Sequence, residues 1–399
     1  MSGRRDTLLE WRKEFPILET STYLISNSLG AMPRGVYRKL REYADAWAKR
    51  GVRAWSDSWW EMPLAAGDAI APLIGAGPGE LSMHANISLL QAILISCFDF
   101  RGTRNRVVMS DMEFPSNLYV YQKFAGRLGA RLRVVRSDDG ISVPTEKLLD
   151  AIDERTKLVP ISHVLFKSAY IQDIRAVVRK AHSCGAIVIL DTYHSVGIIP
   201  VDVRQLGVDV LVGGVLKWLC GGPGASFLWM RPSLRKKLQP AVTGWFAHRH
   251  PFAFETSMRY TGGAGKFLNG TPSISALAAA QVGPGIIARA GMENVRRKSM
   301  RQTALLIGEA ERRGFAVRSP LDPERRGGTV TVHVPHAHGV SRELIRRNII
   351  VDYRRGAGIR LAPHFYNSDE ELLAVMESIE NILRTKAYRR HEGKSYTVT

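Results

Sequence analysis

The sequence has few cysteines, fewer acidic than basic residues, and no long hydrophobic run. Its three cysteines, Cys97, Cys184 and Cys220, are far apart and odd in number, so they predict reduced thiols rather than a disulfide framework or a metal site. No apolar run approaches the roughly 18 residues of a membrane span. The N-terminus lacks the apolar segment of a secretory signal. We therefore expect a cytoplasmic protein with no membrane partner and no bound metal.

The shortage of acidic residues gives the chain a strong positive charge. There are 56 Lys and Arg against 37 Asp and Glu, a net charge of +19. Such a balance can mark a nucleic-acid partner. Here the basic residues occur as short scattered pairs, such as Arg312-Arg313 and Arg346-Arg347, and no nucleic-acid-binding motif accompanies them. We predict no nucleic-acid partner, and a basic surface that draws anionic substrates.

Length and hydrophobic patterning predict a large α/β domain with a smaller companion. The 399 residues exceed one simple core. Short apolar runs alternate with amphipathic helical patterns from about residue 80 to 230, which is typical of a mostly parallel sheet covered by helices. We expect an N-terminal segment over 1–60 that packs with the small domain, a large cofactor-binding domain over 61–280, a small domain over 281–385, and a tail over 386–399. The expected strands of the large domain are 106–110, 131–135, 157–162, 186–190, 208–212 and 225–229, and the expected helices are 116–128, 143–152 and 174–183.

The last third of the chain predicts a small α+β domain. One long helix is expected over 282–312, followed by a strand over 329–334 and a helix from Ser341. An extended segment over 349–353, a strand over 358–362 and a helix over 369–384 complete it. Residues 385–399 are expected to form a solvated tail.

Two residues at expected strand ends suggest a cofactor. Asp191 ends one apolar run. Lys217 comes directly after the next apolar run, which ends in Val-Gly-Gly-Val-Leu. Ligands of parallel sheets bind at the carboxyl ends of the strands. Pyridoxal 5'-phosphate (PLP) needs a lysine for its Schiff base and an Asp that keeps the pyridine nitrogen protonated. The alternative is an exposed loop lysine beside a strand-capping Asp.

Motifs along nearly the whole chain resemble class V enzymes of PLP fold-type I, and kynureninases most of all. Each motif is short, but their order and spacing match that family. The resemblance implies a PLP-dependent transferase-like fold with a large and a small domain. The motifs are Asn27-Ser28-Leu29-Gly30, Glu113-Phe114-Pro115, Ser162-His163-Val164, the Asp191–Gly197 run, Gly244–His248, Asn269–Pro272 and Gly358–Ser368.

The resemblance assigns cofactor roles residue by residue. Lys217 would form the Schiff base and then move the Cα proton, and Asp191 would hold the pyridine nitrogen. His194 would lie beside the cofactor in a supporting role, with a core histidine as the alternative. Phe114 would stack on the ring. The phosphate would be bound by Asn86 and Ile87, and by Trp245 and Thr271 of a neighbouring subunit, which implies a homodimer.

The resemblance also assigns the substrate site. Arg360 would clamp the substrate carboxylate with its planar fork. Asn27, Ser28 and Gln91 would lie around the rest of an amino-acid substrate. In a kynureninase the reaction is hydrolytic cleavage of the Cβ–Cγ bond, which yields alanine and an aryl acid.

The chain also departs from the kynureninase pattern. The residue before the lysine, commonly a Tyr near the phosphate in that family, is Leu216 here. Gln91 stands where some relatives have a His, and Leu165 where the family often has Asn. Three readings therefore stay open: a kynureninase-type hydrolase, a class V enzyme with another reaction (aminotransfer, β-elimination, epimerisation or oxidative deamination), and a non-enzymatic regulator of the same fold.

Overall fold

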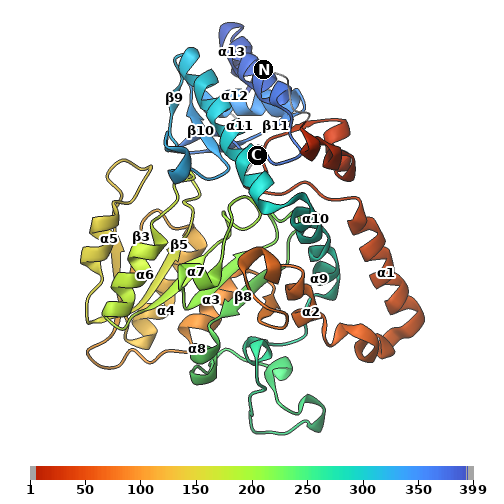
Figure 1. Cartoon of the computed structure of the whole chain (residues 1–399), viewed down its shortest axis with the longest axis vertical. Coiled ribbons are helices and arrows are strands. Elements are labelled where there is room, and N and C mark those ends of the chain that lie inside the picture. Colours follow the sequence, from red (N-terminus) through yellow and green to blue (C-terminus); the bar gives the residue numbers. More distant parts are fainter. Residues whose placement is uncertain (1–5, 392, 394–399) are drawn as a thin grey trace.

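A seven-stranded sheet forms the centre of the larger domain (Figure 1). The computed structural model describes residues 6–391 and 393. Strands β3 to β7 are parallel, whereas β8 runs antiparallel to both β7 and β2. In spatial order the strands are β2 (Leu81–His84), β8 (Ser226–Met230), β7 (Val210–Gly214), β6 (Ile187–Asp191), β5 (Thr156–Ser162), β3 (Arg106–Ser110) and β4 (Arg131–Val135).

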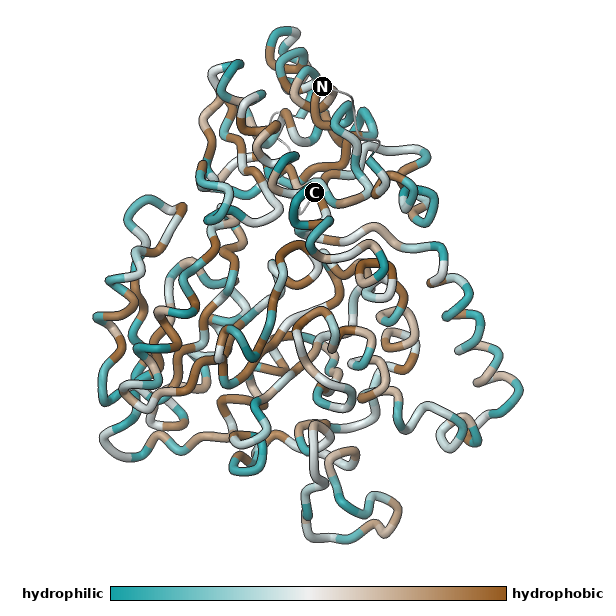
Figure 2. The backbone as a smooth tube through the Cα atoms, in the orientation of Figure 1, coloured by the Kyte–Doolittle hydropathy of each residue, from teal (hydrophilic) through white to brown (hydrophobic). Residues whose placement is uncertain are grey.

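The central strands are apolar because both faces of the sheet are covered. Along β6, Val188 and Leu190 join one buried cluster while Ile189 joins another. Figure 2 shows the hydrophobic residues gathered along these central strands. The helices of this part are α2 (Met62–Asp68), α3 (Ile87–Ile95), α4 (Pro115–Leu128), α5 (Thr145–Ala151), α6 (Ile174–Ser183), α7 (Val203–Leu206), α8 (Pro232–Lys237) and α9 (Ile274–Ala280).

The expected alternation of strands and helices is confirmed. Each of the six predicted strands lies within two residues of an observed one, and the helix predicted over 174–183 is α6. Strand β2 was not predicted, since Leu-Ser-Met-His has too few residues to establish a period. None of the helices in the described part of the chain is long and apolar enough to cross a membrane.

The smaller domain has its own antiparallel sheet and its own core. Its strands lie in the order β12, β13, β10, β9. Helices α12 and α13 pack against it (Figure 1, top). The elements are β9 (Ala316–Val317), β10 (Val330–His333), α12 (Ala337–Arg346), β11 (Ile349–Ile350), β12 (Asp352–Arg354), β13 (Gly358–Leu361) and α13 (Asp369–Arg384).

The single helix expected over 282–312 is in fact two helices. Helix α10 (Val282–Ala290) ends before Gly291, and α11 (Met292–Arg312) begins after it. Gly291 has a φ of 83°, a left-handed conformation that glycine adopts without steric cost and that no α-helix can contain. The prediction was wrong because the apolar pattern continues through this glycine.

The tail is also shorter than expected. Ala387–His391 form a 3₁₀ helix, and Tyr388 is only 7% exposed. Its ring stacks on His336 with centroids 4.0 Å apart. A solvated tail from residue 386 is therefore wrong for these residues, because one aromatic ring docks them on α12. Residues 392 and 394–399 lie outside the described residues.

The N-terminal segment is divided between the two domains. Strand β1 (Thr22–Tyr23) pairs in parallel with β11, and Arg12 forms an ion pair of 2.8 Å with Glu371 on α13. Helix α1 (Gly35–Arg50) packs instead against α9 of the large domain, to the right in Figure 1. Packing with the small domain therefore describes the first part of this segment and not α1.

Candidate active site

The sheet brings Lys217 and Asp191 to the same edge. Asp191 is the last residue of β6, and Lys217 follows β7 by three residues. The backbone of the lysine segment is fixed from the N-terminal side, where Gly30 N–H donates to the Leu216 carbonyl at 2.9 Å. A Cβ on Gly30 would overlap the Lys217 carbonyl oxygen, so this contact requires glycine.

The Lys217 amine is surrounded by aromatic rings and one imidazole. Its Nζ lies 2.5 Å from His194 Nε2, 4.8 Å from the Tyr193 ring centroid and 5.4 Å from that of Phe114. Burial, together with the cation of Arg360, lowers the pKa of Lys217 to about 7. Burial also holds the pKa of His194 well below its ordinary value. A neutral His194 therefore lies within hydrogen-bond distance of an amine that exchanges protons near neutral pH.

Asp191 is a buried carboxylate held by two N–H donors. Asn117 Nδ2 donates to Oδ2 at 2.6 Å, and the Tyr193 backbone N–H donates to Oδ1 at 2.9 Å. Burial raises the pKa of Asp191 because the charged form loses its hydration. A cationic partner would offset that cost, and a protonated pyridine nitrogen is such a partner.

Phe114 presents an aromatic face beside the lysine. It precedes α4, its side chain is 39% exposed, and its ring packs edge-on against Phe166 at 5.2 Å. The loop before it is anchored by Glu113, whose carboxylate accepts from Ser110 Oγ and from Ser162 N, both at 2.8 Å. Burial raises the pKa of Glu113 to about 7. The ring is thus held at a fixed place over the edge of the sheet.

The residues predicted to bind phosphate from this chain lie at the start of α3. Asn86 caps the helix, since its Oδ1 accepts from Leu89 N at 2.9 Å. Ile87 is the first helical residue. The first backbone N–H groups of an α-helix favour anions, through their free hydrogens and the helix dipole. Both residues are therefore suitably placed for a phosphate group.

Trp245 and Thr271 are not brought to Lys217 within one chain. Trp245 Nε1 donates to Pro251 O at 2.6 Å in the projecting loop at the bottom of Figure 1. Thr271 lines a cavity of about 260 Å³ together with His84. Within the described residues, no hydrogen bond or ring contact joins either of them to Lys217. A role at the phosphate would require them to act on a second copy of the chain.

Arg360 lies in the small domain and reaches across to the large one. Its Nε and Nη2 donate to Asp352 at 3.0 and 2.5 Å, and its Nη1 donates to the Phe166 carbonyl at 2.6 Å. Arg354 pairs with the same Asp352 at 2.9 Å. The Asp352 carboxylate therefore fixes the orientation of the guanidinium. A further hydrogen bond joins it to Phe166, whose ring packs against Phe114.

The other predicted substrate residues occupy different surroundings. Asn27 is fully buried, and neither atom of its amide has a hydrogen-bond partner among the described residues. Ser28 is half-buried, and its N–H donates to Ile25 O at 2.8 Å. Gln91 is buried and accepts from Tyr121 Oη at 2.8 Å. The Asn27 amide thus has no hydrogen-bond partner among the described residues, whereas the Gln91 side-chain oxygen already accepts a hydrogen bond.

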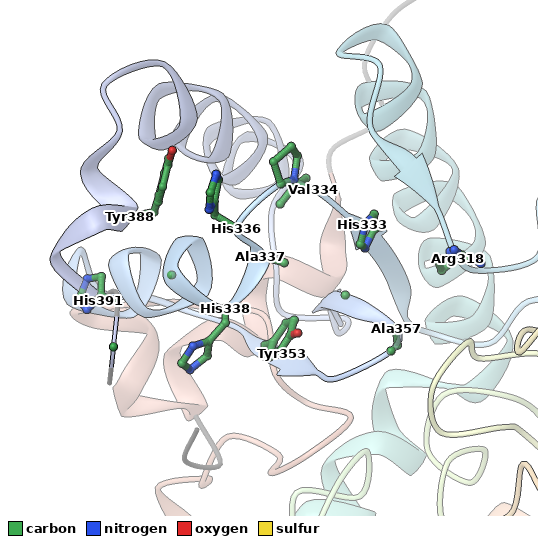
Figure 3. Close-up of a pocket in the computed structure, with 15 residues that line it drawn as sticks. Arg318, His333, Val334, His336, Ala337, His338, Tyr353, Ala357, Tyr388 and His391 are labelled. Atoms are coloured by element: carbon green, nitrogen blue, oxygen red, sulfur yellow. The ribbon is translucent and has the colours of Figure 1, made fainter. Parts of the chain in front are cut away.

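Several cavities lie outside this group of residues, including one beside the lysine segment and one in the small domain. One of about 520 Å³ is apolar and is lined by Leu29, Gly30 and Cys220, beside the lysine segment. Burial raises the pKa of Cys220 to about 12, as expected for an unreactive thiol. The other, of about 580 Å³, lies in the small domain and includes His336 and Tyr353 (Figure 3). None of the predicted site residues lines this second cavity.

The residues around Lys217 fit PLP. They provide a half-buried amine with a lowered pKa, an aromatic face and a helix N-terminus. They also provide a buried carboxylate, Asp191, which has no cation at hydrogen-bond distance among the described residues. When PLP is bound, its ring withdraws electrons from an attached amino acid. Lys217, Asp191, Phe114 and the start of α3 would hold it.

Comparison with known proteins decides the family. The model of the aminotransferase class-V family matches residues 22–365. The chain belongs to the aminotransferase class-V family. This membership confirms the predicted resemblance, and with it PLP as the cofactor.

Relatives within the family include kynureninases. The chain is 33% identical to the kynureninase of Pseudomonas fluorescens, over 96% of this chain and 94% of that protein. It is 30% identical to the kynureninase of Burkholderia pseudomallei strain 1106a, over 98% and 95%.

Solved structures support the fold. A cysteine desulfurase from Thermococcus onnurineus NA1 superposes with a TM-score of 0.83 at 23% identity, covering 96% of this chain and all of that one. The cystine C–S lyase C-DES gives a TM-score of 0.83 at 18% identity, over 92% and 98%. These likenesses confirm the fold class predicted from the sequence.

Three polar residues of this class-V site were not predicted from the sequence. Asn117 and Tyr193 contact Asp191, and Asp352 holds Arg360. Asn117 had a signal, because it lies three residues after Phe114 at the start of a predicted helix and so shares its face. Asp352 lies eight residues before Arg360, and only the antiparallel pairing of β12 with β13 places the two opposite each other.

Proposed function

We propose that the chain is a PLP-dependent hydrolase of the kynureninase type. Its reaction would cleave the Cβ–Cγ bond of kynurenine or a substituted relative. One water molecule is consumed: its hydroxyl joins the acyl carbon, Cβ gains a proton, and the products are alanine and an aryl acid. The observation that carries the proposal is 33% identity to a kynureninase over nearly the full length. The charges of Arg360 and Asp191, both of which act on Lys217, support it.

The protein residues would divide the work as follows. Arg360 would bind the substrate carboxylate, since its orientation is already set by Asp352. Lys217 would take the Cα proton, because an amine with a pKa of about 7 is a base near neutral pH. Asp191 would keep its charge opposite the pyridine nitrogen, and Asn117 would hold it in place.

His194 and Phe114 would support these steps by position. His194 Nε2 lies 2.5 Å from the Lys217 amine and would orient it through a hydrogen bond. Phe114 would cover one face of the cofactor ring and exclude water from it. The projecting loop with Trp245, and Thr271, would contribute to the site of a second copy in a homodimer.

A second candidate is a class V enzyme with another reaction, such as C–S cleavage. The observation in its favour is Leu216, which has no hydroxyl for the proton transfer assigned to tyrosine in the kynureninase resemblance. Loss of one general acid or base lowers rates by about 10² to 10⁴. Hydrolytic cleavage of the Cβ–Cγ bond is therefore the reaction that the leucine at position 216 would slow most.

The experiment is a substrate comparison with the purified, PLP-loaded protein. L-kynurenine is incubated with it, and anthranilate and alanine are quantified by chromatography. Parallel reactions contain L-cysteine or L-cystine, with sulfide or persulfide as the product measured. Equimolar anthranilate and alanine support the proposal. No product from saturating L-kynurenine, with turnover of a sulfur amino acid, would replace it with the second candidate.

A further inference from the structure

Tyr193 is the aromatic residue nearest to the Lys217 amine. The Lys217 Nζ lies 4.8 Å from its ring centroid, closer than to Phe114. The ring lies flat against Gly214, the last residue of β7. A Cβ on Gly214 would overlap the ring and lie 2.6 Å from the tyrosine oxygen. A glycine three residues before Lys217 therefore makes room for this phenol.

The hydroxyl of Tyr193 points along the edge of the sheet toward β8. Gly214 pairs with Ser226 of β8, and Ser226 pairs with His84, the last residue of β2. The Ser226 hydroxyl is buried and makes no other hydrogen bond within the described residues. It lies close enough to Tyr193 to oppose part of the pKa rise that burial and Asp191 cause. The Tyr193 phenol thus lies close to Ser226 on β8, and Ser226 lies opposite His84 on the neighbouring strand β2.

This edge leads directly to the start of α3. Only Ala85 and Asn86 separate His84 from the first helical residue, Ile87. The Tyr193 ring also packs against the buried cluster that contains Ile87 and Leu90. Through Ser226 and His84, this edge of the sheet thus connects the Tyr193 hydroxyl to the first N–H groups of α3.

Leu216 leaves that region without the hydroxyl that a tyrosine before the lysine would supply. The leucine is half-buried, and its carbonyl accepts from Gly30 N–H at 2.9 Å. We infer that the Tyr193 hydroxyl donates a hydrogen bond to the phosphate of PLP. It would thus supply, from the segment that follows β6, the hydroxyl that is missing at position 216. This rests on the cofactor and on the proposed phosphate position at α3, but not on the kynureninase reaction.

Tyr193 has the protonation state that this role needs. Burial, with a contribution from the Asp191 charge, raises its pKa to about 12, so the phenol keeps its proton at neutral pH. A protonated phenol can donate, whereas a phenolate would repel a phosphate dianion. A hydrogen bond to a charged acceptor contributes about 1.5–3 kcal/mol, which corresponds to roughly a tenfold or larger change in affinity.

The test compares two cofactor forms that differ only in the phosphate. Dissociation constants of PLP and of pyridoxal are measured on the apo protein from tryptophan fluorescence. In Tyr193→Phe, which removes only the hydroxyl, we expect about tenfold weaker PLP binding and unchanged pyridoxal binding. Tyr119→Phe is the matched control, because that tyrosine is 63% exposed on α4. Equal weakening of both cofactors, or of neither, would overturn the inference.

A rescue variant tests the replacement itself. Adding Leu216→Tyr to Tyr193→Phe returns a hydroxyl from the segment that follows β7. We expect this double variant to restore PLP affinity to within about threefold of wild type. A double variant as weak as Tyr193→Phe would show that the two positions are not equivalent. If Tyr193→Phe does not fold, Leu216→Tyr alone carries the test. PLP affinity within about threefold of wild type supports the shared position, because Tyr193 already supplies the hydroxyl, and about tenfold tighter PLP with unchanged pyridoxal overturns it.

Discussion

Lys217 Nζ lies 2.5 Å from His194 Nε2, in surroundings where neither group favours its charged form. At most one of the two carries a positive charge near neutral pH, because burial lowers the pKa of both. Two permanent positive charges, those of Arg360 and Arg354, act on both Lys217 and His194. Under the proposed function, this balance would let Lys217 serve as a nucleophile and base in a site that also binds a carboxylate.

The first prediction concerns the pH at which Lys217 becomes reactive. Its folded pKa is about 7, below the ordinary value of 10.5, so the neutral amine dominates above pH 7. The rate at which the apo protein captures pyridoxal should rise with pH and reach half its plateau near 7. In Arg360→Gln the midpoint should move upward, since a cation that disfavours the ammonium form is lost. Stopped-flow absorbance measures both profiles, and a midpoint near 10 in the wild type would contradict this account.

The second prediction concerns the support of Asp191. Asn117→Ala removes the 2.6 Å hydrogen bond to Oδ2, which raises the pKa of Asp191 further and weakens its hold on a pyridinium. We expect PLP binding to weaken about tenfold, from the loss of one charge-assisted hydrogen bond. Asp191→Ala should weaken it more. Ser116→Ala, one residue away on α4, is the control for general effects on the helix. Unchanged PLP affinity in Asn117→Ala would contradict the assignment.

The residues proposed to bind the cofactor were easier to predict from the sequence than the contacts that position them and Arg360. Lys217 and Asp191 are each local to a strand end, so one apolar run and its last residue suffice to place them. Asp352 and Tyr193 depend on pairings between strands and on the space left by Gly214, which no single segment reveals. The fold shows the same limit, since the short strand β2 and the break at Gly291 were not predicted.

The third prediction concerns Arg360. Lysine in its place could not reach Asp352 and Phe166 O together, because it has one nitrogen where arginine has three. Arg360→Lys is expected to raise KM for the amino-acid substrate by about tenfold or more with a smaller change in kcat. Steady-state kinetics separates the two. A large fall in kcat with constant KM would indicate that Arg360 acts in the chemical step and not in carboxylate binding.

The fourth prediction concerns Gly30. A Cβ there would overlap the Lys217 carbonyl and approach Cys220 Cα to 2.9 Å. Gly30→Ala should destabilise the fold by about 1–3 kcal/mol, the usual range for overpacking, and should slow PLP capture as well. Gly126→Ala is the matched control: its Cβ meets nothing within 4 Å on helix α4, so stability should rise by roughly 0.5–1 kcal/mol. Thermal denaturation and denaturant titration measure both changes, and equal effects would contradict the proposed close approach.

The most direct test of the central claim is to locate the cofactor chemically. The PLP-loaded protein is reduced with borohydride, digested, and analysed by mass spectrometry for the pyridoxyl group. We predict a single modified lysine, Lys217, with loss of both the modification and the visible absorption band in Lys217→Ala. A pyridoxyl group on another lysine, or a Lys217→Ala protein that keeps a reducible cofactor adduct, would contradict the account.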